Sequence, residues 1–315
     1  MTAPDTRLRP NRRYLLLAAI LLVALYVLLP QFGNFRSSWH LLSRPLPYWT
    51  AAAIGLGALT YLAAAATYCL LAFRPLRYGQ VVLVQLAAMF INRLLPGGIG
   101  ALGANYAYLR RAGHSTSQAG GVVAINNLLG ALGHGLLVAG ALAVFPGSMA
   151  VPPGHSWSEA SIAKLALGLT ILLTFLALVF GRRKFTAKAA EVRVQLLSYH
   201  HRPWRLPAAL ASSMLLTLCN VFCLACCALA LGVHLPFLAI LLIFSLGIGA
   251  GTATPTPGGL GGFEAALAAG FIAYHVASPA ALAVALLYRL VSYWLPLPAG
   301  AAALIICQKR QLLSA

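Results

Sequence analysis

The short pattern Pro-Gly-Gly-Ile/Leu-Gly occurs twice in this chain, each time inside a very hydrophobic stretch. The copies are residues 96–100 and 257–261, so they lie 161 residues apart (257 − 96), about half of the 315-residue chain. The same offset aligns His114 with His275, which favours an internal duplication over a chance pair of turns. Because Pro and Gly interrupt helices and release backbone groups that lipid cannot satisfy, matching breaks in two halves predict a transport site.

The composition excludes an ordinary soluble protein. Hydrophobic residues make up 61% of the chain and charged residues only 8%, whereas a soluble domain carries roughly 25% charged residues. There are 22 Lys and Arg against 4 Asp and Glu, for a formal charge of +18. The basic residues form short clusters between apolar stretches, which is typical of membrane topology signals and contact with anionic headgroups. We therefore expect a membrane partner and no nucleic acid.

We expect an all-α polytopic protein that forms a single membrane domain over residues 1–315. A spanning helix needs about 20 apolar residues. Two further hydrophobic regions, 79–111 and 236–275, contain the Pro-Gly-Gly breaks, and each holds two helical pieces joined at its break. The piece from Gly98 to Leu109 is too short to cross a bilayer. Each region is therefore predicted to be a re-entrant hairpin. The six predicted spans are 14–30, 47–73, 118–146, 160–181, 206–231 and 280–307.

The distribution of basic residues predicts the orientation. With both termini in the cytoplasm of a bacterial inner (plasma) membrane, six crossings and two hairpins place 17 of the 22 basic residues on the cytoplasmic side. Seven of them lie in the loop 182–205, which is either an interfacial amphipathic helix or a simple basic loop. Repeat 1 (about 14–146) and repeat 2 (about 160–307) each contain an odd number of crossings. The sequence thus predicts two inverted-topology repeats.

The interrupted segments supply the first candidate binding residues. Helical pieces begin just after Gly98 and Gly259, and their amide-rich ends favour an anion. Glycine also lets a backbone approach a ligand closely. The alternative is that these glycines only permit tight helix packing. The candidates here are Pro96, Gly97, Gly98, Gly100, Pro257, Gly258, Gly259 and Gly261.

Three charged residues fall inside the predicted membrane core: Arg93, Glu264 and Arg289. A charge at mid-membrane costs about 2.5–3.5 kcal/mol on insertion scales, so such residues are functional candidates. If Glu264 pairs with Arg289, Arg93 has no acidic partner in the membrane. An anionic headgroup would then neutralise the positive charge of Arg93. The alternative is that Arg93 extends to an interface. Tyr288 and Tyr293 accompany Arg289 as candidates.

Asn126 and Asn127 complete the candidate set, because the repeat places them within one residue of Tyr288 and Arg289. Intramembrane asparagines most commonly hold helices together. The chain lacks His-Glu-x-x-His, a Walker loop and Gly-x-Ser-x-Gly. We therefore expect no catalytic residue, no metal and no cofactor, and we do not expect the protein to be an enzyme.

Three segments resemble a known family. Residues 255–264 (PTPGGLGGFE) and 287–296 (LYRLVSYWLP) are similar to the C-terminal signature of the lysylphosphatidylglycerol synthase transmembrane region, or flippase-like domain, and 92–100 (NRLLPGGIG) resembles its N-terminal signature. The resemblance covers about 14–307 and implies a polytopic domain that moves lipids between leaflets. We expect no synthase domain beside it, so the resemblance implies no synthase activity for this chain. Family members often carry charges where this chain has Leu102, Gly103, Asn105, Asn126 and Asn127.

These observations favour a flippase-like transporter of an anionic phospholipid or lipid-linked phosphate. Arg93 and Arg289 would bind the headgroup, and Glu264 would orient Arg289 or respond to protons. Three alternatives stay open: an ion or small-solute channel, an intramembrane lipid-modifying enzyme, and an accessory subunit of envelope lipid synthesis. The partner could accordingly also be a second copy of the chain or an envelope-synthesis enzyme.

Overall fold

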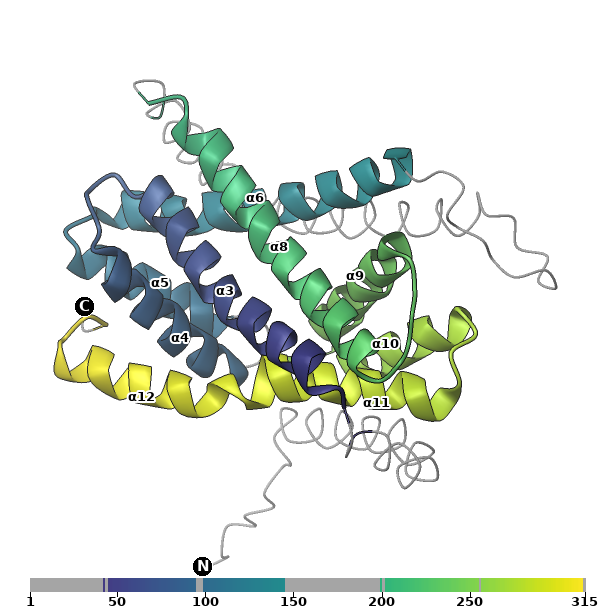
Figure 1. Ribbon diagram of the computed structural model, residues 1–315. Coiled ribbons are helices and arrows are strands. Elements are labelled where there is room, and N and C mark those ends of the chain that lie inside the picture. Colours follow the sequence, from purple (N-terminus) through teal and green to yellow (C-terminus); the bar gives the residue numbers. More distant parts are fainter. Residues whose placement is uncertain are drawn as a thin grey trace, which may run out of the picture.

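Helices make up every element of this protein that the structure describes. The computed structural model describes residues 42, 45–94, 99–144, 199, 202–254 and 256–313, and these ranges contain no strand. The predicted all-α membrane class is confirmed (Figure 1). Four helical runs are long and apolar enough to cross a membrane: α3 (Pro47–Leu71), α6 (Thr116–Val144), α8 (Arg205–Ala230) and the run Ser278–Lys309.

These four runs agree with the predicted spans 47–73, 118–146, 206–231 and 280–307. The last run consists of α11 (Ser278–Arg289), a π-helical turn η5 (Leu290–Trp294) and α12 (Pro296–Lys309). The predicted spans 14–30 and 160–181 lie outside the described residues, as does most of the loop 182–205.

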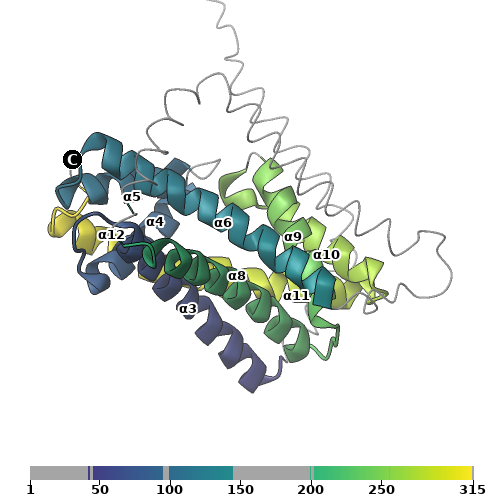
Figure 2. The same cartoon turned by 90° about the horizontal axis from the view of Figure 1, so that it is seen from above.

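The two interrupted regions form helical hairpins. The first consists of α4 (Tyr78–Leu94) and α5 (Ile99–Arg111). The second consists of α9 (Phe237–Ala253), a 3₁₀ turn η4 (Pro257–Gly259) and α10 (Gly262–Ala273). The first hairpin lies in the left half of the molecule and the second in the right half in both views (Figures 1 and 2).

The helix boundaries follow the sequence repeat. Adding 161 to the bounds of α4 and α5 gives 239–255 and 260–272, within two residues of α9 and α10. The same addition to α3 gives 208–232, within three residues of α8. The order of elements is therefore the same in the two halves, and their inverted relation to the membrane stays a prediction.

Packing divides the interior into two cores, one around each hairpin. The first contains Val84 and Ile125, and the second contains Leu241 and Phe271, all fully buried. Helix α3 packs along α8, and both helices bury alanines (Ala53, Ala63, Ala65 and Ala209). Small residues let helix backbones approach closely, which matters in lipid because large apolar side chains gain little there by leaving the bilayer.

Basic residues gather at one end of the bundle, where α3, α5 and α12 end and α8 begins. Arg205 there donates to the carbonyl of Ala72 at 3.0 Å, which ties the start of α8 to the end of α3. The described residues at the opposite end, 45–50, 231–237 and 274–278, contain no Lys, Arg, Asp or Glu. The basic end is formed by Arg74, Arg77, Arg110, Arg111, Arg202, Arg205, Lys309 and Arg310.

Candidate functional site

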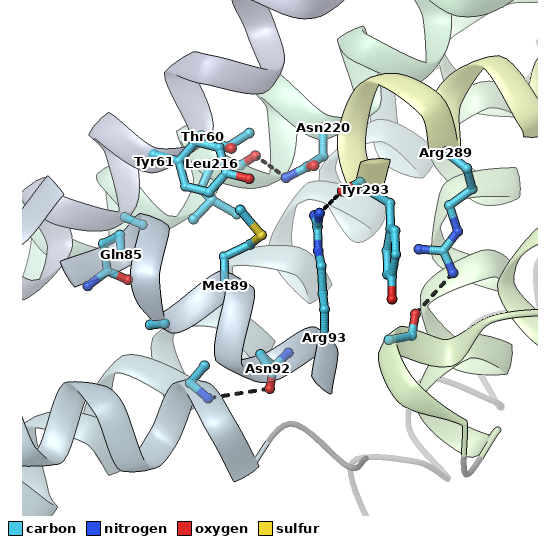
Figure 3. Close-up of a pocket in the computed structure, with 14 residues that line it drawn as sticks. Thr60, Tyr61, Gln85, Met89, Asn92, Arg93, Leu216, Asn220, Arg289 and Tyr293 are labelled. Atoms are coloured by element: carbon cyan, nitrogen blue, oxygen red, sulfur yellow. Dashed lines mark hydrogen bonds between the residues drawn. The ribbon is translucent and has the colours of Figure 1, made fainter. Parts of the chain in front are cut away.

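A cavity of about 550 Å³ lies in the middle of the bundle, between the two cores. Its walls come from both halves of the chain, namely from α3, α4, α5, α8, η4, α11 and η5 (Figure 3). The polar side chains in its wall are Thr60, Tyr61, Gln85, Asn92, Arg93, Asn220, Arg289 and Tyr293.

Arg289 and Glu264 form the predicted ion pair, with 2.5 Å between Nε and Oε1. The other carboxylate oxygen accepts the backbone N–H of Gly261 at 2.8 Å, at the N-terminus of α10 where a negative charge is favourable. Both oxygens of Glu264 are therefore engaged. Arg289 Nη2 also donates to the carbonyls of Gly258 (3.0 Å) and Gly259 (3.3 Å), so this side chain joins the second hairpin to α11.

Arg93, at the end of α4, is held by backbone carbonyls. Its guanidinium donates to the carbonyl oxygens of Ser292 and Tyr293 in the π-helical turn. Proline has no N–H, so Pro296 cannot donate to Ser292 at the α-helical spacing, and Pro298 cannot donate to Tyr293 at the π spacing. The sequence of η5 and α12 therefore leaves acceptors available for this arginine in the interior of the bundle.

The two guanidinium groups lie on either side of one aromatic ring. The Cζ atom of Arg93 is 4.3 Å from the centroid of the Tyr293 ring, and that of Arg289 is 5.0 Å from it. Figure 3 shows the three side chains in a row. Within the described ranges Glu264 is the sole acidic residue. Two positive charges thus meet one negative charge, and the site carries a net charge of +1.

The glycines of the second break serve close contacts within the protein. Gly258 has a positive φ of 64°, and a Cβ there would lie 2.4 Å from the ring of Tyr293. A Cβ on Gly259 would lie 2.6 Å from the carbonyl oxygen of Gly251 in the facing helix. In the first hairpin, a Cβ on Gly100 would lie 2.7 Å from the backbone of Ile91.

The second hairpin therefore differs from the expected anion cradle of N–H groups. Carbonyl oxygens of Gly258 and Gly259 face Arg289, and the N–H of Gly261 is taken by Glu264. The anion at this helix end is the protein's own carboxylate. The positive charge available to a ligand comes from guanidinium groups instead.

The structure brings together some of the other predicted residues. Tyr288 is buried and donates from its hydroxyl to Oδ1 of Asn220 at 3.3 Å, and Pro257 begins η4 beside the cavity wall. Asn126 and Asn127 lie on α6 and are not among the described residues that line the cavity. Pro96, Gly97 and Gly98 lie outside the described residues.

Several lining residues are not among the site residues predicted from the sequence. Thr60 and Tyr61 come from the middle of apolar α3, and Asn220 comes from α8. Gln85 lies on α4, where its Nε2 donates to Oδ1 of Asn105 at 2.7 Å. Asn92 accepts the N–H of Ala101 at the start of α5, 3.4 Å away. Together these residues add amide and hydroxyl groups to the cationic pair.

A second cavity of about 340 Å³ lies on the other side of Arg289. It shares Asn92, Gly258 and Arg289 with the first cavity. The remaining wall comes mainly from the end of α9 and from Phe263, whose ring centroid lies 4.5 Å from Cζ of Arg289. Arg289 and Gly258 therefore form the partition between two polar spaces.

Metal ligands are not gathered in the part of the chain that the structure describes, where no group of three or more His, Cys, Asp or Glu could hold an ion. The four cysteines of α8 are buried free thiols.

A comparison with protein families matches residues 16–300 to the model described as the lysylphosphatidylglycerol synthase TM region. No curated protein matches the chain significantly. The predicted resemblance is confirmed.

Proposed function

The chain belongs to the lysylphosphatidylglycerol synthase transmembrane family, and from that premise we propose that it translocates an anionic phospholipid or a lipid-linked phosphate between leaflets. The family and the apolar helices support a multi-pass membrane protein with a lipid-related function. The proposed role is transport without chemical conversion of the lipid. Its direction across the membrane follows from whichever gradient or ion drives it.

The net positive charge of the central cavity carries this proposal. Among the described residues, Arg93 contacts uncharged groups, which include two carbonyls, the ring of Tyr293 and the hydroxyl of Tyr61. Backbone carbonyls orient a guanidinium but do not cancel its charge. An arginine offers a phosphate group two parallel hydrogen bonds, and such charge-assisted pairs are the strong ones. A phosphate beside Arg93 would bring the charge of the site to zero.

The dimensions of the cavity fit a headgroup. Small-molecule sites occupy about 300–1,000 Å³, and this cavity of about 550 Å³ lies within that range. The acyl chains of a phospholipid would stay in the bilayer while the polar group occupies the protein. The second cavity, across Arg289, would receive the headgroup as it passes the partition.

The asymmetry of charge supports an orientation. Cytoplasmic ends of membrane helices carry an excess of Lys and Arg. The basic end of the bundle, to which Lys309 and Arg310 belong, is therefore proposed to face the cytoplasm of a bacterial inner membrane. The C-terminus would then lie in the cytoplasm. The N-terminus would lie on the same side if 14–30 and 160–181 span the membrane as the sequence predicts.

The test is translocation of tail-labelled phosphatidylglycerol in vesicles reconstituted with the purified protein. Arg93→Gln removes the charge without orphaning an acid, and we expect it to reduce the rate at least tenfold. Arg77→Gln, at the exposed basic end, is the matched control and should leave the rate unchanged. Because a lone Glu264 would be a buried unpaired charge, Arg289→Gln is combined with Glu264→Gln. A wild-type rate in both site variants would refute the proposal.

A further inference from the structure

The wall of the central cavity points to discrimination between headgroups. Building on the proposed function, we infer that this protein selects a phosphodiester lipid whose headgroup is an uncharged polyol. A lipid whose headgroup carries an added ammonium group is excluded by the charges of the same wall. Glycerol attached through one phosphate is the simplest member of the selected class.

The argument begins with the negative charge available to the headgroup. An ammonium group inside a membrane protein needs a carboxylate or an equivalent set of acceptors. Glu264 is the one acid in the described ranges, and its two oxygens bind Arg289 and the N–H of Gly261. A second positive group in the cavity would face Arg93 and Arg289 with no carboxylate left for it.

Hydrogen-bonding groups that remain in the wall suit hydroxyls. Within the described residues, the side-chain amide nitrogen of Asn92 and Nη1 of Arg289 have no acceptor, which leaves both as donors to a ligand. The hydroxyl of Thr60 donates to the carbonyl of Gly57 at 2.6 Å, so its oxygen can still accept. The side-chain oxygen of Gln85 accepts nothing from the described chain. A hydroxyl both donates and accepts, and it can use such a mixed wall without bringing charge.

The experiment measures preference between two lipids in the same reconstituted vesicles. Phosphatidylglycerol and lysylphosphatidylglycerol share the phosphate and the glycerol but differ by the amino-acid cation. Unlabelled phosphatidylglycerol should inhibit the translocation of tail-labelled phosphatidylglycerol. We expect half-inhibition at a concentration at least tenfold lower than the lysyl lipid requires. Equal or stronger competition by the lysyl lipid would overturn the inference while leaving translocation intact. Transport of neither lipid would instead refute both the inference and the proposed translocation of a phospholipid.

A single substitution tests whether cavity charge sets this preference. Asn92→Asp keeps the oxygen that accepts the N–H of Ala101 and places a carboxylate in the wall. We expect the preference for phosphatidylglycerol over the lysyl lipid to fall to about threefold or less. The new carboxylate attracts the ammonium group and repels the phosphate, and specificity is the difference between the two affinities. An unchanged ratio in a folded Asn92→Asp protein would contradict the inference.

Gln118→Glu is the matched control for this substitution. It also turns an amide into a carboxylate, at the start of α6, where Gln118 Oε1 accepts the N–H of Ser115 at 3.0 Å. The added charge lies outside the cavity wall, so the ratio should remain that of the wild type. The melting temperature of each variant in detergent shows that a changed ratio does not reflect unfolding.

Discussion

At the scale of single residues, Gly258 joins the backbone of the second break to the cationic pair. Its φ of 64° is left-handed, and a Cβ added to it would lie only 2.4 Å from the ring of Tyr293, which leaves no room for a side chain. Gly258→Ala should therefore destabilise the protein by about 1–3 kcal/mol and slow translocation, since the carbonyl of Gly258 holds Arg289. Thermal unfolding in detergent measures the first effect.

The control for Gly258 is Gly103 on α5, where an added Cβ would meet nothing within 4 Å. Because alanine is favoured over glycine in a helix by up to about 1 kcal/mol, Gly103→Ala should leave the melting temperature unchanged or raise it. Equal melting temperatures for the two variants would show that the backbone at Gly258 is not constrained as described.

His114 makes stability depend on pH through contacts outside the membrane-spanning helices. The buried ring accepts the N–H groups of Phe73 and Arg74 on Nε2, at 3.2 and 3.3 Å, and donates from Nδ1 to Leu109 at 3.1 Å. Burial lowers the pKa of His114 from its ordinary 6.5, and Arg74 lowers it further, against the opposing effect of the Leu109 carbonyl. The folded protein therefore favours the neutral form of this ring more than the unfolded chain does.

The sign of the pH effect follows from that lowered pKa. Below pH 6.5 the unfolded chain binds a proton at His114 that the folded chain does not, so stability falls as the pH drops toward the folded pKa. Above pH 6.5 this contribution is constant. The melting temperature should decrease between pH 7.5 and 5.5, and by less in His114→Gln. The control is His275→Asn, at an exposed position, and its melting temperature should fall with pH as in the wild type. A fall of the same size in His114→Gln would contradict the assignment to His114.

At the scale of elements, the π-helical turn between α11 and α12 is the feature that positions Arg93. Pro296→Ala restores an N–H that can reach the carbonyl of Ser292, in competition with the guanidinium. We expect translocation to slow while the melting temperature stays level or rises. Pro47→Ala, at the start of α3, removes a proline from a first helical turn and should change neither quantity. Faster transport in Pro296→Ala would contradict this role.

The sequence could predict the elements better than the faces they present. Hydropathy and the Pro-Gly-Gly breaks located α3, α6, α8 and both hairpins because apolar length is what a bilayer demands. The same uniform hydropathy hides which side of α3 carries Tyr61 into the cavity, since the lipid-facing and protein-facing sides are both apolar.

The pairing of Glu264 with Arg289 was predictable for a related reason, because few charges could satisfy one another in the membrane core. The partner of Arg93 was not. It is a pair of carbonyls, and their availability depends on the local helix type at residues 290–294, which a count of charges does not reveal. The same holds at Gly258, where the conformation of three residues decides whether carbonyls or N–H groups face the cavity.

At the scale of the whole molecule, the charge asymmetry predicts which end faces the cytoplasm. In a protein whose six native cysteines are replaced, Ser115→Cys marks the basic end and Tyr48→Cys marks the opposite end, and both positions are exposed. A membrane-impermeant thiol reagent should label Tyr48→Cys from the outside of intact cells and Ser115→Cys only after disruption. The reverse pattern would invert the orientation.

The central claim is that an anionic headgroup binds between the two halves of the bundle, beside Arg93. An experimental structure of the protein in phosphatidylglycerol nanodiscs tests it most directly. The account predicts phosphate density in the central cavity within hydrogen-bonding distance of Arg93 or Arg289, and its loss in Arg93→Gln. Headgroup density confined to the basic end of the bundle, with the cavity holding only water in both proteins, would contradict it.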